Sequence, residues 1–220
     1  MVLSADLLLK SQRGIDMTLS EFDNEIRKDH NVVCGCDEAG RGPLAGDVFA
    51  AAVIFDKDTV IEGINDSKKL TAKKREELFD EIMEKAVDFS IQTATVEEIE
   101  DINILSAAML AMKRAVEDMD TKPDVCLIDG NKTPEGLECP AIAVVKGDAK
   151  SQAVAAASIL AKVARDRYME QMAEQYPEYR FEKHKGYGTK LHYQMIEQYG
   201  PCGIHRMSFL KKYYAKKNGH

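Results

Sequence analysis

The chain has 220 residues, 45% of them hydrophobic and 30% charged, with a formal net charge of -7. Such a chain is long enough to form one globular domain, or one domain with an appendage, without disulfides or a structural metal. No apolar run reaches the length of a membrane span, the five cysteines show no zinc-ligand spacing, and the first ten residues lack the basic lead of a secretory signal, so we expect a cytoplasmic protein.

A helical extension is predicted at residues 1–30, ahead of the domain proper at 31–220. Leu19, Phe22 and Ile26 recur at helical spacing, and acidic residues stand in the first turn, where the helix dipole favours them. The pattern identifies a helix with one apolar face but gives it no role.

Five strands are expected in the domain. They cover 32–37, 47–55, 89–96, 124–129 and 140–145, each an apolar or alternating run bounded by turn residues. Helices are expected after Thr71, at 104–119, at 150–175, and in the tail at 189–199 and 208–215. A strand hairpin with an added strand, followed by alternating helix and strand, predicts an α/β domain. Its five-stranded mixed sheet would be flanked by helices, with further helices at the C-terminus.

The first predicted strand ends in two adjacent carboxylates, Asp37 and Glu38, and Gly40-Arg41-Gly42-Pro43 follows. Neighbouring acids at the end of a buried strand repel each other and lose hydration, so a compensating group is expected. A polar strand end with a hairpin turn would explain the acids alone. It would not explain two glycines that leave the backbone bare on both sides of Arg41.

Two further acids stand at comparable positions: Asp129 ends the fourth predicted strand, and Asp148 opens the helix after the fifth. Strand ends meet at one edge of an open α/β sheet, so these carboxylates are expected to approach Asp37 and Glu38. Four carboxylates in one pocket require cations. Oxygen ligands without His or Cys indicate two Mg²⁺ or Mn²⁺ ions, an arrangement suited to hydrolysis at phosphorus. Asp148 could instead cap its helix, and Asp129 with Gly130 could form a plain turn.

The charge is unevenly distributed along the chain. Residues 179–220 carry nine Lys or Arg against two Glu, a local charge of +7, together with six of the eight tyrosines. Basic charge interleaved with aromatic side chains is typical of a surface that follows nucleic-acid phosphates, although a solvated Lys-rich helix has the same composition. An acidic protein overall is therefore compatible with a nucleic-acid partner.

Six sequence blocks, in this order, resemble the signature of ribonuclease HII. They are Asp37-Glu38-Ala39-Gly40-Arg41-Gly42-Pro43, Asp66-Ser67-Lys68, Asp129-Gly130-Asn131, Lys146-Gly147-Asp148, Ala156-Ala157-Ser158-Ile159-Leu160-Ala161-Lys162 and His184-Lys185-Gly186-Tyr187-Gly188-Thr189. The resemblance implies a ribonuclease H-like fold with the first and fourth strands adjacent. It also implies that the catalytic, metal-binding acids are Asp37, Glu38, Asp129 and Asp148. We expect the protein to be a monomer.

The activity implied by the resemblance is that of a metal-dependent endoribonuclease. It would hydrolyse the RNA strand of RNA:DNA hybrids and incise duplex DNA on the 5′ side of embedded ribonucleotides, leaving 3′-hydroxyl and 5′-phosphate ends. The backbone of Gly40, Arg41 and Gly42 would read the ribonucleotide 2′-hydroxyl, and Tyr187 would pack against the following deoxyribose. The remaining implied substrate contacts are Ser67, Lys68, Asn131 and Lys146.

Three alternatives stay open at this point. The nearest is a ribonuclease HIII, which resembles the same pattern but lacks Gly-Arg-Gly and carries a longer N-terminal domain. A hybrid-binding module without activity would keep the acids only for folding. A metal-dependent phosphatase for small molecules would have no use for the basic, Tyr-rich C-terminal segment.

Overall fold

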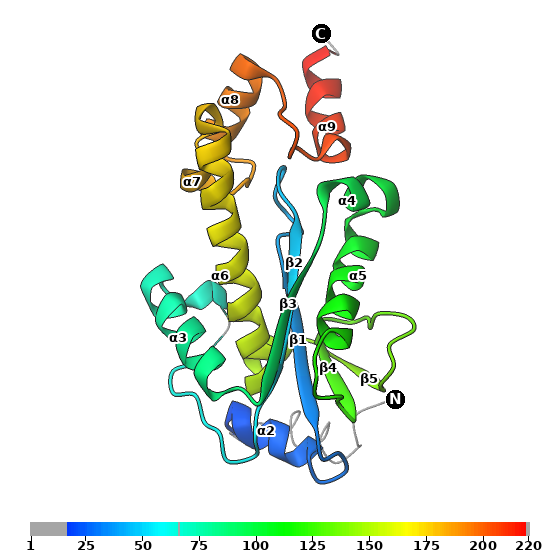
Figure 1. Cartoon of the computed structure of the whole chain (residues 1–220). Coiled ribbons are helices and arrows are strands. Elements are labelled where there is room, and N and C mark those ends of the chain that lie inside the picture. Colours follow the sequence, from blue (N-terminus) through cyan, green and yellow to red (C-terminus); the bar gives the residue numbers. More distant parts are fainter. Residues whose placement is uncertain (1–16, 66, 219–220) are drawn as a thin grey trace.

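A five-stranded mixed sheet lies at the centre of the molecule (Figure 1), in a computed structural model that describes residues 17–65 and 67–218. The strand order is β3-β2-β1-β4-β5. The strands are β1 (Val33–Ala39), β2 (Val48–Ile54), β3 (Asp88–Ala94), β4 (Val125–Asp129) and β5 (Ala141–Val144). β2 is antiparallel to both β1 and β3, whereas β1, β4 and β5 run parallel. The predicted mixed sheet, with its first and fourth strands adjacent, is confirmed.

Helices cover both faces of the sheet. The helices are α2 (Leu19–Ile26), α3 (Ala72–Lys85), α4 (Val96–Ile102), α5 (Ile104–Glu117), α6 (Gln152–Gln175), α7 (Phe181–His184), α8 (Lys190–Tyr199) and α9 (Met207–Asn218). α5 packs on one face, while α6 and α3 cover the other (Figure 1). α7, α8 and α9 lie beyond the end of the sheet at which β1 ends. None of the described helices is long and apolar enough to cross a membrane.

β1 and α6 approach each other backbone to backbone. A Cβ at Gly35 would lie 2.2 Å from the carbonyl carbon of Ala153, so only glycine fits at this crossing. Side chains two residues apart share one face of a strand, and Asp37 therefore points to the α6 side of the sheet. The close packing of an Ala-rich helix on β1 thus sets how far Asp37 stands from α6.

The described part of the predicted N-terminal extension is built into the domain. α2 begins with a capping box in which Thr18 and Glu21 satisfy each other's backbone N–H groups. Phe22 and Ile26 are buried against the parallel strands, and Asp23 accepts a hydrogen bond from the N–H of Ala153 at 2.9 Å. Burial raises the pKa of Asp23 to about 6. The domain boundary at residue 30 stays a prediction, and residues 1–16 lie outside the described part.

Two local expectations differ from the structure. The third strand ends at Ala94 rather than at residue 96, because Thr95 caps the short helix α4 through a capping box with Glu98. In the tail, much of the aromatic and histidine content is interior: Tyr179, His192 and His205 are all buried. These side chains form a small second core around α6, α7 and α8 and are not available as stacking platforms.

Candidate active site

The acid pair of β1 lies level with the acid that ends β4. The parallel register pairs Cys36 with Ile128, so the next residues, Asp37 and Asp129, stand side by side at the same edge of the sheet. Asp37 is only 6% exposed, and its Oδ1 accepts a hydrogen bond from the N–H of Glu38 at 2.7 Å. Burial, and then the negative charges of Glu38, Asp129 and Asp148, raise the pKa of Asp37 well above its ordinary value. The carboxylates therefore repel one another, as the sequence pattern predicts.

The turn between β5 and α6 is tied to the end of β4. The N–H of Gly147 donates to Oδ1 of Asp129 at 2.7 Å, and the next residue is Asp148, which is 8% exposed. α6 is capped by Ser151, whose hydroxyl accepts from the N–H of Val154. Because Ser151 occupies that position, the alternative that Asp148 caps the helix is wrong. Asp129 likewise does more than form a turn, since it holds the segment that carries Asp148.

The donor set of these acids fits hard divalent cations. All four side chains are carboxylates, and Asp37 faces the negative charges of the other three, which a bound cation would offset. Among residues 17–65 and 67–218, however, no three His, Cys, Asp or Glu side chains converge closely enough to enclose an ion by themselves. Magnesium ions commonly keep several waters and use substrate phosphate oxygens as ligands. A complete protein shell is therefore not required for the acids to hold such ions.

A pocket of about 480 Å³ opens beside the acids. Its lining residues are Asp37, Glu38, Ala39, Gly40, Arg41, Gly42, Ser67, Lys68, Ile104, Ser158, Lys162, Tyr187 and Phe209. The Arg41 guanidinium, about half exposed, forms an ion pair with Glu38 at 3.0 Å. Tyr187 is 42% exposed and stands next to Gly42, where a Cβ would lie 3.7 Å from the tyrosine ring. Acid, cation, bare backbone and an aromatic ring thus share one open cavity.

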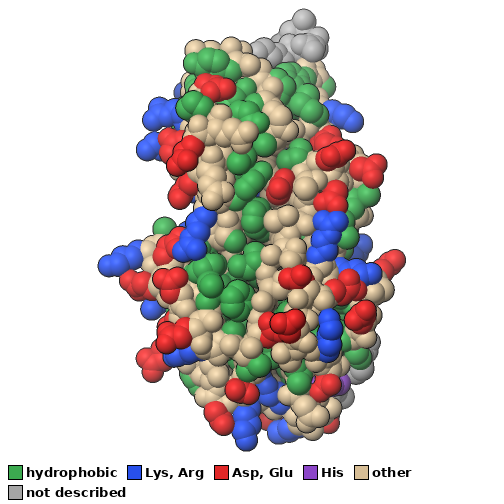
Figure 2. All heavy atoms as spheres, in the orientation of Figure 1, with side chains coloured by type: hydrophobic (Ala, Val, Ile, Leu, Met, Phe, Trp, Pro, Cys, Tyr) green, Lys and Arg blue, Asp and Glu red, His purple; other side chains and the backbone are tan. Residues whose placement is uncertain are grey.

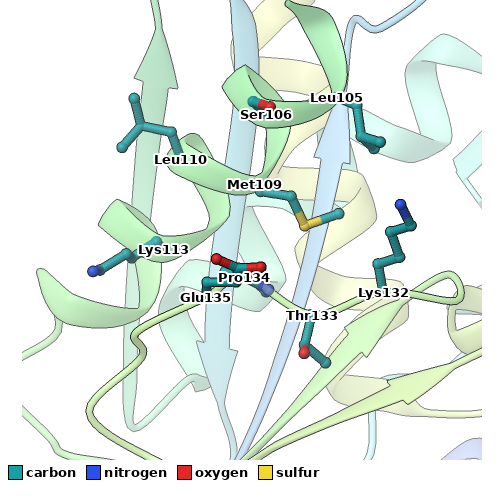
Figure 3. A pocket seen from close by; sticks show the side chains of 9 residues that line it. All are labelled: Leu105, Ser106, Met109, Leu110, Lys113, Lys132, Thr133, Pro134 and Glu135. Carbon is teal, nitrogen blue, oxygen red and sulfur yellow. The ribbon is translucent and has the colours of Figure 1, made fainter. Parts of the chain in front are cut away.

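A second pocket, of about 380 Å³, lies between α5 and the segment after β4 (Figure 3). Met109 reaches from the helix towards the segment that carries Lys132 and Thr133. No residue of the predicted site lines this pocket. The chemistry suggested by the acids therefore belongs to the first pocket.

The surface charge does not form a single-sign patch on the face seen in Figure 2, where acidic and basic side chains are interspersed. Part of the basic charge of the C-terminal segment is also internal or paired. Arg206 is fully buried, and Lys185 forms an ion pair with Glu170 at 2.8 Å. The excess of Lys and Arg in that segment is thus partly structural.

A family model described as ribonuclease HII matches residues 34–212. The chain belongs to the ribonuclease HII family. Among its relatives, ribonuclease HII of Caldicellulosiruptor saccharolyticus is 53% identical over 90% of this chain and 97% of its own length. Ribonuclease HII of Idiomarina loihiensis is 59% identical over 81% of this chain and 95% of its own.

Solved structures agree with this assignment. The crystal structure of ribonuclease H2 from Pyrococcus horikoshii OT3 superposes with a TM-score of 0.67 at 30% identity, covering 80% of this chain and 93% of that one. A Bst-RNase HIII shares the fold alone, with a TM-score of 0.67 at 17% identity. The family model decides between the two types in favour of ribonuclease HII. The chain is accordingly a ribonuclease H, a hydrolase of nucleic acid that acts on RNA:DNA hybrids.

The structure brings most of the predicted ribonuclease HII site residues to one pocket. Four of them do not line it. Asp129 and Asp148 lie beside Asp37, whereas Asn131 and Lys146 are exposed elsewhere. Asp66 lies outside the described residues.

Ser158 and Lys162 line the pocket but were not predicted as site residues. Their spacing of four along α6 places them on one helix face, which is the signal that could have found them.

Proposed function

We propose that this ribonuclease HII cleaves the RNA strand of RNA:DNA hybrids and also incises duplex DNA on the 5′ side of an embedded ribonucleotide, leaving 3′-hydroxyl and 5′-phosphate ends. One observation carries the proposal: the acid pair Asp37 and Glu38 lines the same pocket as Gly40-Arg41-Gly42. Phosphodiester hydrolysis with divalent ions uses clustered carboxylates. Backbone donors free of side chains suit recognition of a 2′-hydroxyl, the group that distinguishes RNA from DNA.

The acids are proposed to hold two divalent cations, Mg²⁺ or Mn²⁺. When bound, such ions supply an activated water and stabilise the leaving 3′ oxygen. The chain's own part is to keep the ligands in place: the N–H of Glu38 fixes the carboxylate of Asp37, and the N–H of Gly147 fixes that of Asp129. Asp148 follows Gly147 directly, so the same hydrogen bond also holds the fourth acid near the other three.

The part of the pocket formed by Arg41, Gly42 and Tyr187 is proposed to bind the strand that is cut. The exposed backbone of Arg41 and Gly42 would meet the ribose 2′-hydroxyl and adjoining phosphates, and the ring of Tyr187 would pack against the following deoxyribose. The additional proposed phosphate contacts are Ser67, Lys68, Asn131 and Lys146. We propose that the protein works as a monomer in the cytoplasm.

Cleavage of three duplexes of one sequence tests the proposal. The labelled strand carries a single ribonucleotide, all ribonucleotides, or none, and each duplex is incubated with Mg²⁺, with Mn²⁺ and with EDTA. We expect cleavage of the first two only, abolished by EDTA, with 3′-hydroxyl and 5′-phosphate ends identified by end labelling. Binding without metal-dependent cleavage, or cleavage of the all-DNA strand at a similar rate, would contradict the proposal.

A further inference from the structure

Arg206, which directly precedes α9, is completely buried, and the loop at residues 40–46 is folded around its side chain. Nε donates to the carbonyl of Gly46 at 2.8 Å. One terminal nitrogen donates to Arg41 at 3.2 Å and Pro43 at 2.9 Å, and the other to Gly40 at 2.8 Å and Gly46 at 2.6 Å. Five donated bonds equal the full donor capacity of a guanidinium. The acceptors are four backbone carbonyls of one short loop, and that of Gly46 accepts two of the five bonds.

This arrangement fixes the direction of two peptide groups. A trans peptide unit is planar, and its C=O and N–H point in opposite directions. Because the guanidinium holds the carbonyls of Gly40 and Arg41, the N–H groups of Arg41 and Gly42 point away from Arg206. Neither N–H donates a backbone hydrogen bond within the described part of the chain. Both residues are exposed and line the pocket beside the acids.

The buried half of the loop is anchored from the same side. The N–H of Leu44 donates to the carbonyl of Gly186, and the N–H of Arg206 donates to the carbonyl of Leu44, both at 2.8 Å. The exposed tip has no such backbone partner for its N–H groups, so the orientation of its peptide planes depends on the guanidinium. Glycine-rich backbone samples many conformations when it is not held, which makes this restraint necessary.

Burying a charge is unfavourable unless hydrogen bonds compensate it. Burial lowers the pKa of Arg206 to about 9, so the side chain still carries its charge at neutral pH. A charged fork can satisfy several carbonyls in one plane at once. A lysine, with three donors on a single nitrogen, cannot reproduce that geometry.

We propose that Arg206 is a positioning residue for ribonucleotide recognition. It sets the N–H groups of Arg41 and Gly42 towards the pocket, so that they meet the 2′-hydroxyl and adjoining phosphate of the ribonucleotide, and it thereby contributes to the preference for a ribonucleotide over a deoxyribonucleotide. The inference rests on the function proposed above for this loop. Arg206 itself touches no substrate atom in this scheme and acts only through the backbone.

The substitution Arg206→Lys tests the inference. Arg27→Lys is the matched control, because Arg27 also donates to a backbone carbonyl, that of Phe55 at 2.8 Å, but in a part of the molecule that does not line the pocket. Dissociation constants are measured with Ca²⁺ for a duplex with one ribonucleotide and for the all-DNA duplex of the same sequence. Their ratio gives the ribonucleotide preference.

We expect Arg206→Lys to reduce this ratio about tenfold, a loss equal to one good hydrogen bond, while affinity for the all-DNA duplex changes less than about twofold. The control should keep the wild-type ratio even if its melting temperature falls. With Mg²⁺, Arg206→Lys should raise KM for the ribonucleotide duplex more than it lowers kcat. A purely structural role predicts a lower melting temperature with an unchanged ratio, and that result would overturn the inference.

A measurement on the wild-type protein keeps the inference testable if Arg206→Lys does not fold. NMR hydrogen exchange should slow at the amides of Arg41 and Gly42 when the ribonucleotide duplex binds, and not when the all-DNA duplex binds. Equal protection by both duplexes would refute the inference. Failure of the wild type to cleave a ribonucleotide duplex would instead refute the proposed function, so the two failures are distinguishable.

Discussion

The two glycines of the Gly-Arg-Gly loop are expected to respond very differently to alanine. Gly40 has a φ of +103°, which side chains rarely adopt, and a Cβ there would lie 2.2 Å from Nε of Arg165. Arg165 is 1% exposed, and its guanidinium donates to the carbonyls of Ala45, Asp47 and Lys185. At Gly42 the nearest atom to a new Cβ is 3.7 Å away, which is ordinary contact. Gly40→Ala should therefore destabilise the fold, and Gly42→Ala should not.

The size of the effect follows from these distances. Ordinary contact begins at 3.4 Å, so Nε of Arg165 must move by 3.4 − 2.2 = 1.2 Å, and its 3.3 Å bond to Asp47 is lost. Losing a charged hydrogen bond costs about 1.5–3 kcal/mol, and placing a Cβ residue at positive φ costs about 1–2 kcal/mol. The sum is about 2.5–5 kcal/mol. A protein of this size loses about 2–4 °C per kcal/mol, so Gly40→Ala should melt about 5–20 °C below the wild type.

Differential scanning calorimetry in EDTA measures this difference without a contribution from bound metal. Gly42→Ala should melt within about 2 °C of the wild type, as exposed substitutions usually do. The same variant should bind a ribonucleotide duplex about tenfold more weakly, because its methyl group stands where the substrate approaches. Equal melting temperatures for the two variants would show that the loop does not hold Arg165 in the way described.

Three further predictions concern charge. Asp37→Asn should abolish cleavage, retain duplex affinity and raise the melting temperature in EDTA, because the lost carboxylate faces three negative charges. Asp118→Asn is the control and should cleave normally, because the Asp118 carboxylate accepts from Ser90 and Gln92 and does not line the pocket. Near wild-type cleavage by Asp37→Asn would defeat its assignment. Burial lowers the pKa values of His192 and His205 to about 4, below the ordinary 6.5. Both imidazoles are neutral in the folded protein, so the free energy of unfolding should be greatest above about pH 6.5 and should decrease as the pH falls towards 4. In His205→Gln the melting temperature should vary less across that window, and an unchanged slope would count against the buried pair. Affinity for any duplex should fall more than about tenfold between 50 and 200 mM salt, as gel-shift titrations would show, and salt-independent binding would exclude phosphate contacts.

The positions of the acids could be predicted because they depend on rules visible in sequence. An apolar run that stops at Asp37 and another that stops at Asp129 are strand ends, and parallel neighbouring strands bring their ends together. Six ordered blocks indicated the family and hence that the first and fourth strands are adjacent. Thr71 was recognisable as a helix cap because it precedes an amphipathic run, and the structure has α3 starting at the next residue.

The buried arginines could not be predicted in the same way. Arg165 and Arg206 bind backbone carbonyls, and every residue has a carbonyl, so no residue type marks the partner. From composition, Arg206 was instead assigned to the basic segment at residues 179–220, which was interpreted as a surface. α4 was missed for a different reason: Thr95 continues the alternating pattern of a strand, and this pattern was followed although Thr95 and Glu98 stand at the spacing of a capping box.

The seating of α2 on the first turn of α6 limits how the protein can be shortened. Removal of everything before Val33 would leave the N–H of Ala153 without its acceptor, the carboxylate of Asp23. It would also expose Val33 and Val125 to water. Only two residues separate the segment Gly147–Ala149 from the start of α6, so a loosened first turn of α6 would also loosen the position of Asp148. None of residues 17–32 lines the pocket, yet their removal would impair the site, and recombinant versions should therefore retain residues 17–30.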